Sequence, residues 1–180
     1  MFFLLIEINE LMYEIVGTTA SVTYCGILPR QYPSVADILP EVRAFPVTKI
    51  GNHAFFLCFS LKSVTIPNSV TEIEEWAFGG CKSLELVTIP DSVTAIGDRA
   101  FAYCKSLESI TIPDSVTEIG NGVFKSCDNL KEIILPQSWA NKSLADFYDI
   151  GIDPFMTTVF IGNNNTKSDL YNVNVKEVIA

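Results

Sequence analysis

Hydrophobic positions along the chain recur at a step of 23 residues between residues 50 and 136. Five residue types keep this step, and each of them forms a column of four. The columns are Ile50, Ile73, Ile96 and Ile119; Phe55, Phe78, Phe101 and Phe124; Cys58, Cys81, Cys104 and Cys127; Leu61, Leu84, Leu107 and Leu130; Pro67, Pro90, Pro113 and Pro136. A repeat of this length predicts a solenoid, because each unit can bury its apolar side chains only against its neighbours.

Each unit predicts one short strand. In the third unit the apolar residues Ile110 and Ile112 flank Thr111, and Pro113 follows. Alternation over β-branched residues favours a strand, and proline ends it because it has no backbone donor. Residues 97–104 are too few for a full helix and predict a tight turn or a single helical turn. Stacked units should then form a parallel β-sheet on one face, with short helical turns and loops on the other.

The ends of such a stack need caps, since they would otherwise expose apolar surface. Residues 1–36 lack the repeat and contain strand-like apolar runs, which predict an N-terminal cap with a hairpin around residues 13–25. Residues 37–136 hold the repeats, and residues 37–51 form a degenerate first unit.

The register fails after Pro136, so residues 137–180 predict a C-terminal cap. Residues 137–148 favour a short helix, and residues 157–161 favour a last strand.

The first turn of the array is unusually apolar. Three outer residues, Phe56, Leu57 and Phe59, stand where the next unit has Gly79, Gly80 and Lys82. A contiguous exposed patch of this kind would be costly in water. We expect the N-terminal cap to cover these side chains, and a ligand-binding patch is the alternative.

The repeat unit resembles that of a known family. Over residues 37–136, the unit L-x-x-V-T-I-P-x-S-V-T-x-I-G-x-x-A-F-x-x-C is similar to the BspA-like, or Treponema-type, leucine-rich repeat. The resemblance implies a leucine-rich-repeat right-handed solenoid. It also implies a non-catalytic role in binding host, matrix or cell-surface proteins, usually on secreted or surface-displayed chains.

Composition and charge narrow the classes of partner that the chain is expected to bind. Apolar residues make up 48% of the chain, charged residues 18%, and the net charge is -9. An acidic surface repels phosphate groups, so neither nucleic acid nor anionic lipid is expected as a partner. The longest apolar start is interrupted by Glu7, Glu10 and Glu14, which argues against membrane insertion. No basic residue precedes Arg30, so we expect no signal peptide in this chain. A surface or secreted location rests on the resemblance, and an intracellular one stays open.

The cysteine column could suggest a metal site or disulfides. Zinc ligands usually come in close pairs that converge on one point, whereas this spacing predicts a ladder of thiols along the core. Buried packing is the expected role, although strand spacing alone does not exclude a bridge. Cys25 lies outside the column, and the odd total of 5 leaves at least one thiol unpaired.

Other reactive residue types give no pattern of a catalytic site. His53 is the only histidine and stands at a variable, outer position. Ser69, Ser92 and Ser115 recur after proline, which marks a turn and not a set of nucleophiles. The acidic residues show no calcium-loop spacing; they include Asp91, Asp98, Asp114 and Asp128. We therefore expect no catalytic residues, no metal and no cofactor.

The outward side of the predicted strands is the candidate binding surface, because a solenoid presents its sheet face as an extended area. Its residues are Lys62, Ser63, Thr65, Glu85, Leu86, Thr88, Glu108, Ser109, Thr111, Lys131, Glu132 and Ile134. The threonine column is equally explained by strand propensity. The leading hypothesis is a repeat domain that binds a protein partner, with multivalent display as a way to increase avidity. The alternative is a structural module that self-associates through its caps or edges.

Overall fold

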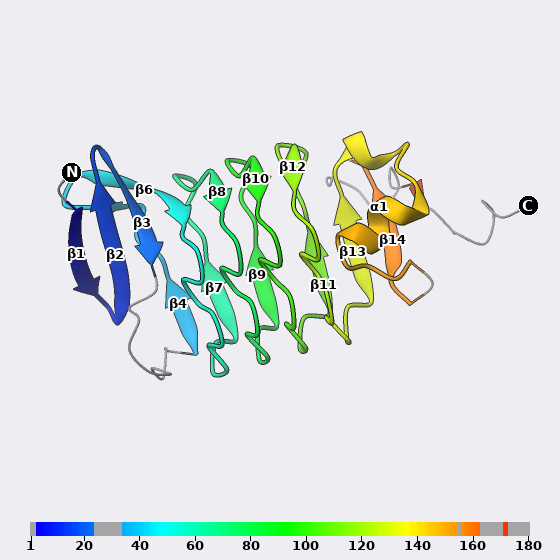
Figure 1. Ribbon diagram of the computed structural model, residues 1–180, viewed down its shortest axis with the longest axis horizontal. Coiled ribbons are helices and arrows are strands. Elements are labelled where there is room, and N and C mark those ends of the chain that lie inside the picture. Colours follow the sequence, from blue (N-terminus) through cyan, green and yellow to red (C-terminus); the bar gives the residue numbers. More distant parts are fainter. Residues whose placement is uncertain (1–2, 24–33, 155, 163–170, 173–180) are drawn as a thin grey trace, which may run out of the picture.

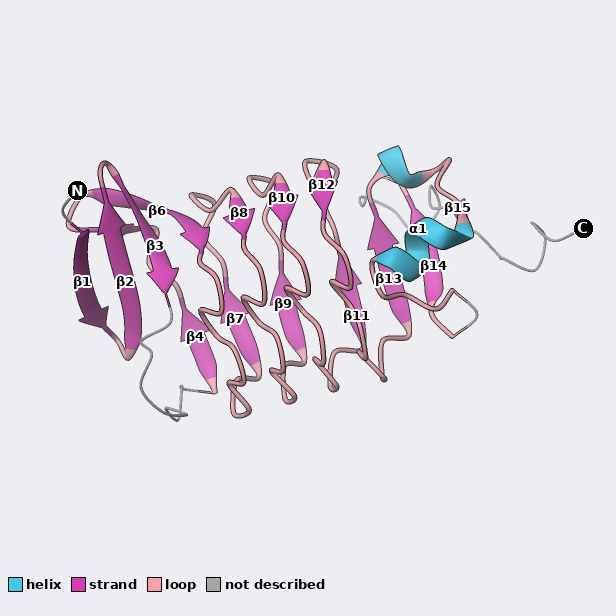
Figure 2. Cartoon of the chain, viewed as in Figure 1, coloured by secondary structure: helices cyan, strands magenta, loops and turns pink. Residues whose placement is uncertain are grey.

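The computed structural model of the protein describes residues 3–23, 34–154, 156–162 and 171–172. Their strands wind into an elongated β-solenoid, whose coils follow one another along the long axis (Figure 1). Helix is confined to two short segments near the C-terminal end of the array (Figure 2). The predicted solenoid is confirmed. The turns of its coils, however, contain no helix in the described residues.

One strand per coil lies where the alternating pattern predicted it. The strands run parallel and in register, so that Val64 lies beside Val87 and Ile110 beside Ile133. They are β4 (Val35–Asp37), β7 (Ser63–Thr65), β9 (Leu86–Thr88), β11 (Ser109–Thr111), β13 (Glu132–Leu135) and β14 (Thr158–Ile161). The strand ladder is interrupted between β9 and β11, which splits this face into the sheets β4-β7-β9 and β11-β13-β14-β15. The last strand, β15 (Tyr171–Asn172), is antiparallel to β14.

A second parallel ladder runs along another side of the coils, where the sequence predicted only turns. Its strands are β6 (Phe45–Ile50), β8 (Glu72–Ile73), β10 (Ala95–Ile96) and β12 (Glu118–Ile119); β5 (Glu41–Val42) pairs with β6. Two residues are too few to show an alternating pattern, which is why the sequence did not predict β8, β10 and β12. The hydroxyls of Thr71, Thr94 and Thr117 each donate to the threonine carbonyl one coil earlier and support this ladder.

The N-terminal strands extend this second sheet. β1 (Phe3–Ile8), β2 (Leu11–Val16) and β3 (Thr19–Thr23) form an antiparallel meander, and β3 pairs in parallel with β6. The hairpin expected around residues 13–25 corresponds to β2 and β3, although residues 24–33 lie outside the described residues. Tyr13 is buried in this meander, and its hydroxyl accepts a hydrogen bond from Leu39 N at 3.1 Å. Burial raises the pKa of Tyr13.

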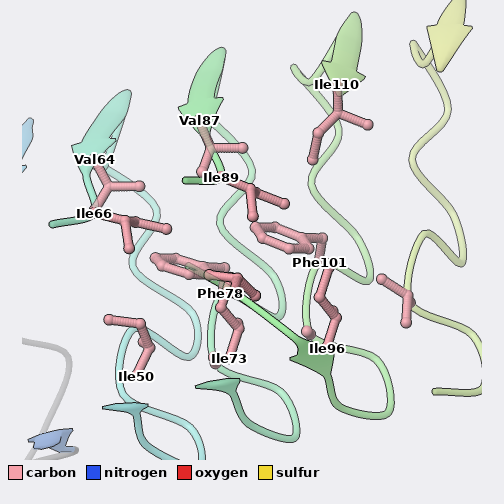
Figure 3. Packing of buried hydrophobic residues seen from close by; sticks show 14 of the residues in the cluster. Ile50, Val64, Ile66, Ile73, Phe78, Val87, Ile89, Ile96, Phe101 and Ile110 are labelled. Carbon is pink, nitrogen blue, oxygen red and sulfur yellow. The ribbon is translucent and has the colours of Figure 1, made fainter. Parts of the chain in front are cut away.

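The core consists of columns of identical side chains from successive coils (Figure 3). All four phenylalanines of the repeat are buried, and neighbouring rings stack almost parallel. The ring centroids of Phe55 and Phe78 are 5.0 Å apart, and those of Phe101 and Phe124 are 6.1 Å apart. Each side chain therefore finds the same shape above and below it, which explains why the residue types repeat so strictly.

The outer apolar residues of the first turn pack on the next coil. Leu57 lies over Gly80, where a Cβ would stand 2.6 Å from the Leu57 Cδ2 atom. Gly80 has a φ of 76°, so two separate requirements select glycine there. Leu57 and Phe59 nevertheless stay 42% and 48% exposed. The expectation that the N-terminal cap covers them was wrong. Their contacts come from the following coil, which covers only one side of each side chain.

The C-terminal segment begins with two short helices where one was predicted. The first is the 3-10 turn η1 (Gln137–Trp139), and the second is α1 (Leu144–Asp149). The second helix starts anew because Ser143 and Asp146 form a capping box, with Ser143 N donating to Asp146 Oδ2 at 2.7 Å. Hydrogen bonds from Ser143 lower the pKa of Asp146. Beyond α1, β14 returns to the register of β13, so the boundary between repeats and cap stays a prediction.

Candidate binding face

The outward columns of the first sheet form the candidate binding face. None of the twelve predicted residues is buried. Eight are exposed: Lys62, Thr65, Glu85, Leu86, Thr88, Glu108, Ser109 and Lys131. Four are half-buried: Ser63, Thr111, Glu132 and Ile134. The alternation of each strand places Val64, Val87, Ile110 and Ile133 in the core instead. The structure thus brings the twelve residues onto one surface, while their role in binding stays a prediction.

Leu86 is the most exposed apolar residue on this face, at 62%. Its register partner Ser63 is polar, and the equivalent residue of the next coil is Ser109. Two shallow hollows flank it. One, of about 500 Å³, lies toward Ser63 and Thr65, and the other, of about 250 Å³, lies toward Ser109 and Glu132. The second hollow spans the interruption between β9 and β11.

Polar side chains around this apolar centre are partly engaged with one another. Lys131 Nζ lies 3.1 Å from Glu108 Oε2, and both side chains are about two-thirds exposed. Such exposed pairs contribute roughly 0–1 kcal/mol, so they leave the charges available to a partner. The Thr65 hydroxyl donates to Asp37 Oδ1 at 2.8 Å and is therefore held in place.

The face also extends further than the sequence analysis predicted. Val35 and Asp37 in β4 continue the columns of Ser63 and Thr65, and Val35 is 51% exposed. At the other end, Thr158 and Phe160 in β14 continue the columns of Glu132 and Ile134. The alternation of the buried residues Ala36 and Ile38 before Pro40 is a sequence signal for β4, although Val35 and Ala36 lie within the predicted N-terminal cap.

The four cysteines of the repeat lie in the core as free thiols. Three of them donate to the carbonyl of the phenylalanine one coil earlier: Cys81 Sγ to Phe55 O at 3.0 Å, Cys104 Sγ to Phe78 O at 3.3 Å, and Cys127 Sγ to Phe101 O at 3.1 Å. Burial raises the pKa of Cys81 and of Cys104 well above the usual range and that of Cys127 to about 12. The predicted core role is confirmed for these thiols, and Cys25 lies outside the described residues.

The remaining reactive residues are engaged in packing and turns. His53 contacts the rings of Phe56 and Trp76, at centroid distances of 5.2 and 6.4 Å. Ser92 and Ser115 donate across coils to the carbonyls of Val70 and Val93, both at 2.7 Å. No cluster of three or more potential metal ligands occurs in the described part of the chain.

The acidic turn residues also have local partners. Asp98 Oδ1 accepts a hydrogen bond from Asn121 N, and Asp114 Oδ1 accepts one from Gln137 N, both at 2.8 Å. Asp128 pairs with Lys105 at 3.1 Å. These contacts indicate that the three carboxylates stabilise the turns. The absence of catalysis stays a prediction, which rests on the resemblance of the repeat to the BspA-like family.

The repeat and its geometry agree with one family model, which matches residues 47–171 with six copies and is described as the BspA type leucine rich repeat region. The chain belongs to the BspA-type leucine-rich repeat family. The match extends past Pro136 and includes β14, which continues the ladder of β13. No curated protein matches the chain.

Solved structures of bacterial leucine-rich repeat proteins are similar to this chain. A leucine-rich repeat protein of Treponema pallidum is 31% identical over 71% of this chain and 59% of its own, with a TM-score of 0.64. One from Bacteroides capillosus is 30% identical over 72% of this chain and 96% of its own, with a TM-score of 0.62. A leucine rich cell surface protein of Faecalibacterium prausnitzii is 27% identical over 91% of this chain and 40% of its own, with a TM-score of 0.71.

The BspA-type chain thus spans less than two thirds of the Treponema and Faecalibacterium proteins. None of the helices in its described residues has the length and apolar character needed to cross a bilayer.

Proposed function

We propose that this BspA-type domain binds a protein partner through the face formed by β4, β7, β9, β11 and β13, in the manner of an adhesion domain. The observation that carries the proposal is Leu86, a 62% exposed leucine between two hollows, whose equivalents in the neighbouring coils are the polar residues Ser63 and Ser109. An apolar centre with a polar rim is the usual arrangement of a protein–protein interface. The family and the cell surface protein of Faecalibacterium prausnitzii support an extracellular setting.

The size of the face limits the affinity of a single copy. Five strands at a spacing of about 4.8 Å span roughly 20 Å, and a standard interface buries about 800 Å² on each partner. A partner would therefore cover most of the face. Moderate affinity that is increased by several copies or by a longer array fits this area best.

Surface plasmon resonance of the full chain over a panel of immobilised matrix proteins tests the proposal. Leu86→Arg and Thr88→Arg place a large cation on the face, whereas Thr94→Arg places the same cation beside the second sheet and is the matched control. We expect the first two variants to weaken any binding at least tenfold and the control to keep it. Unchanged binding of Leu86→Arg and Thr88→Arg would move the site off this face.

A second candidate function, self-association, has an observation of its own at the other end of the molecule. β1 is an edge strand that pairs with β2 and with no other strand of the described residues, and its Leu4 and Leu5 are 46% and 56% exposed. An open apolar edge is a template for pairing with another copy. Light scattering of the wild type and of Leu5→Lys across a concentration series tests it, since a wild type that stays monomeric would exclude this route.

A further inference from the structure

Among the described residues, the second sheet ends at β12, and no further strand pairs with its outer edge. In the earlier coils, threonine carbonyls accept from the next coil: Thr48 O from Thr71 N at 2.8 Å, Thr71 O from Thr94 N at 2.8 Å, and Thr94 O from Thr117 N at 2.9 Å. Isoleucine carbonyls do the same: Ile50 O from Glu74 N at 2.9 Å, Ile73 O from Gly97 N at 2.7 Å, and Ile96 O from Gly120 N at 2.8 Å. The next members of these series, Thr117 O and Ile119 O, accept from no described residue.

No described strand continues the ladder, because the following segment folds differently. Residues 141–142 stand one repeat after β12, and they lie in the connection between η1 and α1. A groove of about 650 Å³ lies between this segment and β12. One wall consists of β10 and β12, and the other of Ser138, Trp139 and Lys142.

We propose that this groove binds an extended peptide segment of another protein, which adds a parallel strand to β12. Two outward carbonyls in a ladder are a ready template for strand addition, because the main chain of the peptide supplies the missing N–H donors. The buried ring of Trp139 gives the groove an apolar floor. This site is separate from the binding face, which lies on the first sheet, so each can fail without the other.

Charge narrows the chemistry of the peptide. Of the described residues that line the groove, Lys142 is cationic and Glu118 is anionic. Lys142 lies over the Trp139 ring, with its Nζ 5.5 Å from the centroid. Its side chain is 45% exposed, and its contact with Asp146 is long, at 3.7 Å. A peptide with β-branched residues in its centre and a carboxylate near one end therefore fits this groove best.

The repeat itself supplies a suitable probe. A synthetic nonapeptide of residues 90–98 carries Thr94 and Gly97, the residues whose N–H groups bond to the β8 coil in the folded chain, and an aspartate near each end. Titration into the ¹⁵N-labelled full chain should shift the amides of Glu118, Ile119 and Gly120 and the indole of Trp139. N-methylation at Thr94 removes one donor and should weaken binding at least tenfold. N-methylation at Asp91 is the matched control and should leave the affinity unchanged.

Two protein variants complete the test. Ser138→Trp fills the groove from an exposed position and should abolish binding, while Ser138→Ala should keep it. Equal binding of the two N-methylated peptides, shifts confined to β7, β9 and β11, or no binding at millimolar peptide would each overturn the proposal. So would a dimer of the chain alone that shifts the same amides, because the groove would then belong to a second copy.

Discussion

The rings of Phe78 and Phe101 stack with their centroids 5.2 Å apart and their planes inclined by only 6°. The two residues are 23 positions apart in the sequence and occupy the same place in successive coils. Backbone hydrogen bonds repeat at the same step, since Phe78 N donates to Ala100 O at 2.8 Å and Phe101 N donates to Val123 O at 3.0 Å, in each case to the residue before the next phenylalanine of the column. Side-chain stacking and main-chain pairing therefore fix the same register.

Removing one ring from the stack should destabilise the whole array. Phe101→Ala leaves a cavity between two fixed neighbours and is expected to lower the free energy of unfolding by about 3–5 kcal/mol. Phe101→Leu keeps most of the volume and should cost roughly half as much or less. Urea denaturation of both variants measures the difference, and a Phe101→Ala midpoint equal to that of the wild type would remove Phe101 from the core.

The sequence predicted the elements that depend on this register. Ile110, Thr111 and Ile112 showed the alternation of β11, and the column of Phe101 predicted the stacked core. Both follow because a repeated position meets its own copy above and below, so one unit determines the packing of the next.

Other features depend on single interactions that leave no repeated pattern in the sequence. The two residues of β12 are too few for a pattern, and the interruption between β9 and β11 falls inside a regular repeat. The cysteine column was correctly placed in the core. Its hydrogen bonds to the phenylalanine carbonyls, such as Cys104 Sγ to Phe78 O, leave no pattern in the sequence. The sequence did not predict Val35 as part of the candidate binding face, because that residue lies before the strict repeat.

Burial should protect Cys81 and Cys104 from alkylation. Only the thiolate reacts, and both thiols are fully buried with a strongly raised pKa. Iodoacetamide at pH 8, followed by peptide mass spectrometry, should label them at least about a hundredfold more slowly in the native chain than in urea. Rapid native labelling of either residue would contradict the buried ladder.

The same burial makes stability depend on alkaline pH. The pKa of Cys127 is raised from 9.0 to about 12 by burial, so the folded state holds its proton more tightly than the unfolded state. The stabilisation is complete below pH 9 and is lost as pH rises toward 12, by about 1.4 kcal/mol per pH unit. Chemical denaturation at pH 7, 9 and 10.5 should show this fall. Cys127→Ser does not titrate in this range and should fall less steeply, whereas parallel curves would contradict the shift.

One turn residue has a left-handed backbone conformation, and replacing it with glycine should stabilise the fold. Ser126 has a φ of 58°, a conformation that glycine adopts without strain and that β-branched residues strongly disfavour. The equivalent residue two coils earlier is Gly80, which also has a positive φ. Ser126→Gly should therefore raise the free energy of unfolding by up to about 1 kcal/mol, and Ser126→Val should lower it by about 1–2 kcal/mol. Thermal unfolding of the pair gives the sign directly, and a more stable valine variant would rule out strain at this turn.

Adjacent positions in β9 should respond in opposite ways to the same substitution. Leu86 is 62% exposed, so Leu86→Arg removes little buried surface and should change the free energy of unfolding by no more than about 0.5 kcal/mol. Val87 is only 5% exposed, and Val87→Arg would bury an unpaired charge in the core, which should cost more than about 4 kcal/mol or prevent folding. Urea denaturation with circular dichroism compares them. Equal losses would mean that β9 does not present Leu86 outward, and Leu86→Arg would then no longer be a clean probe of binding.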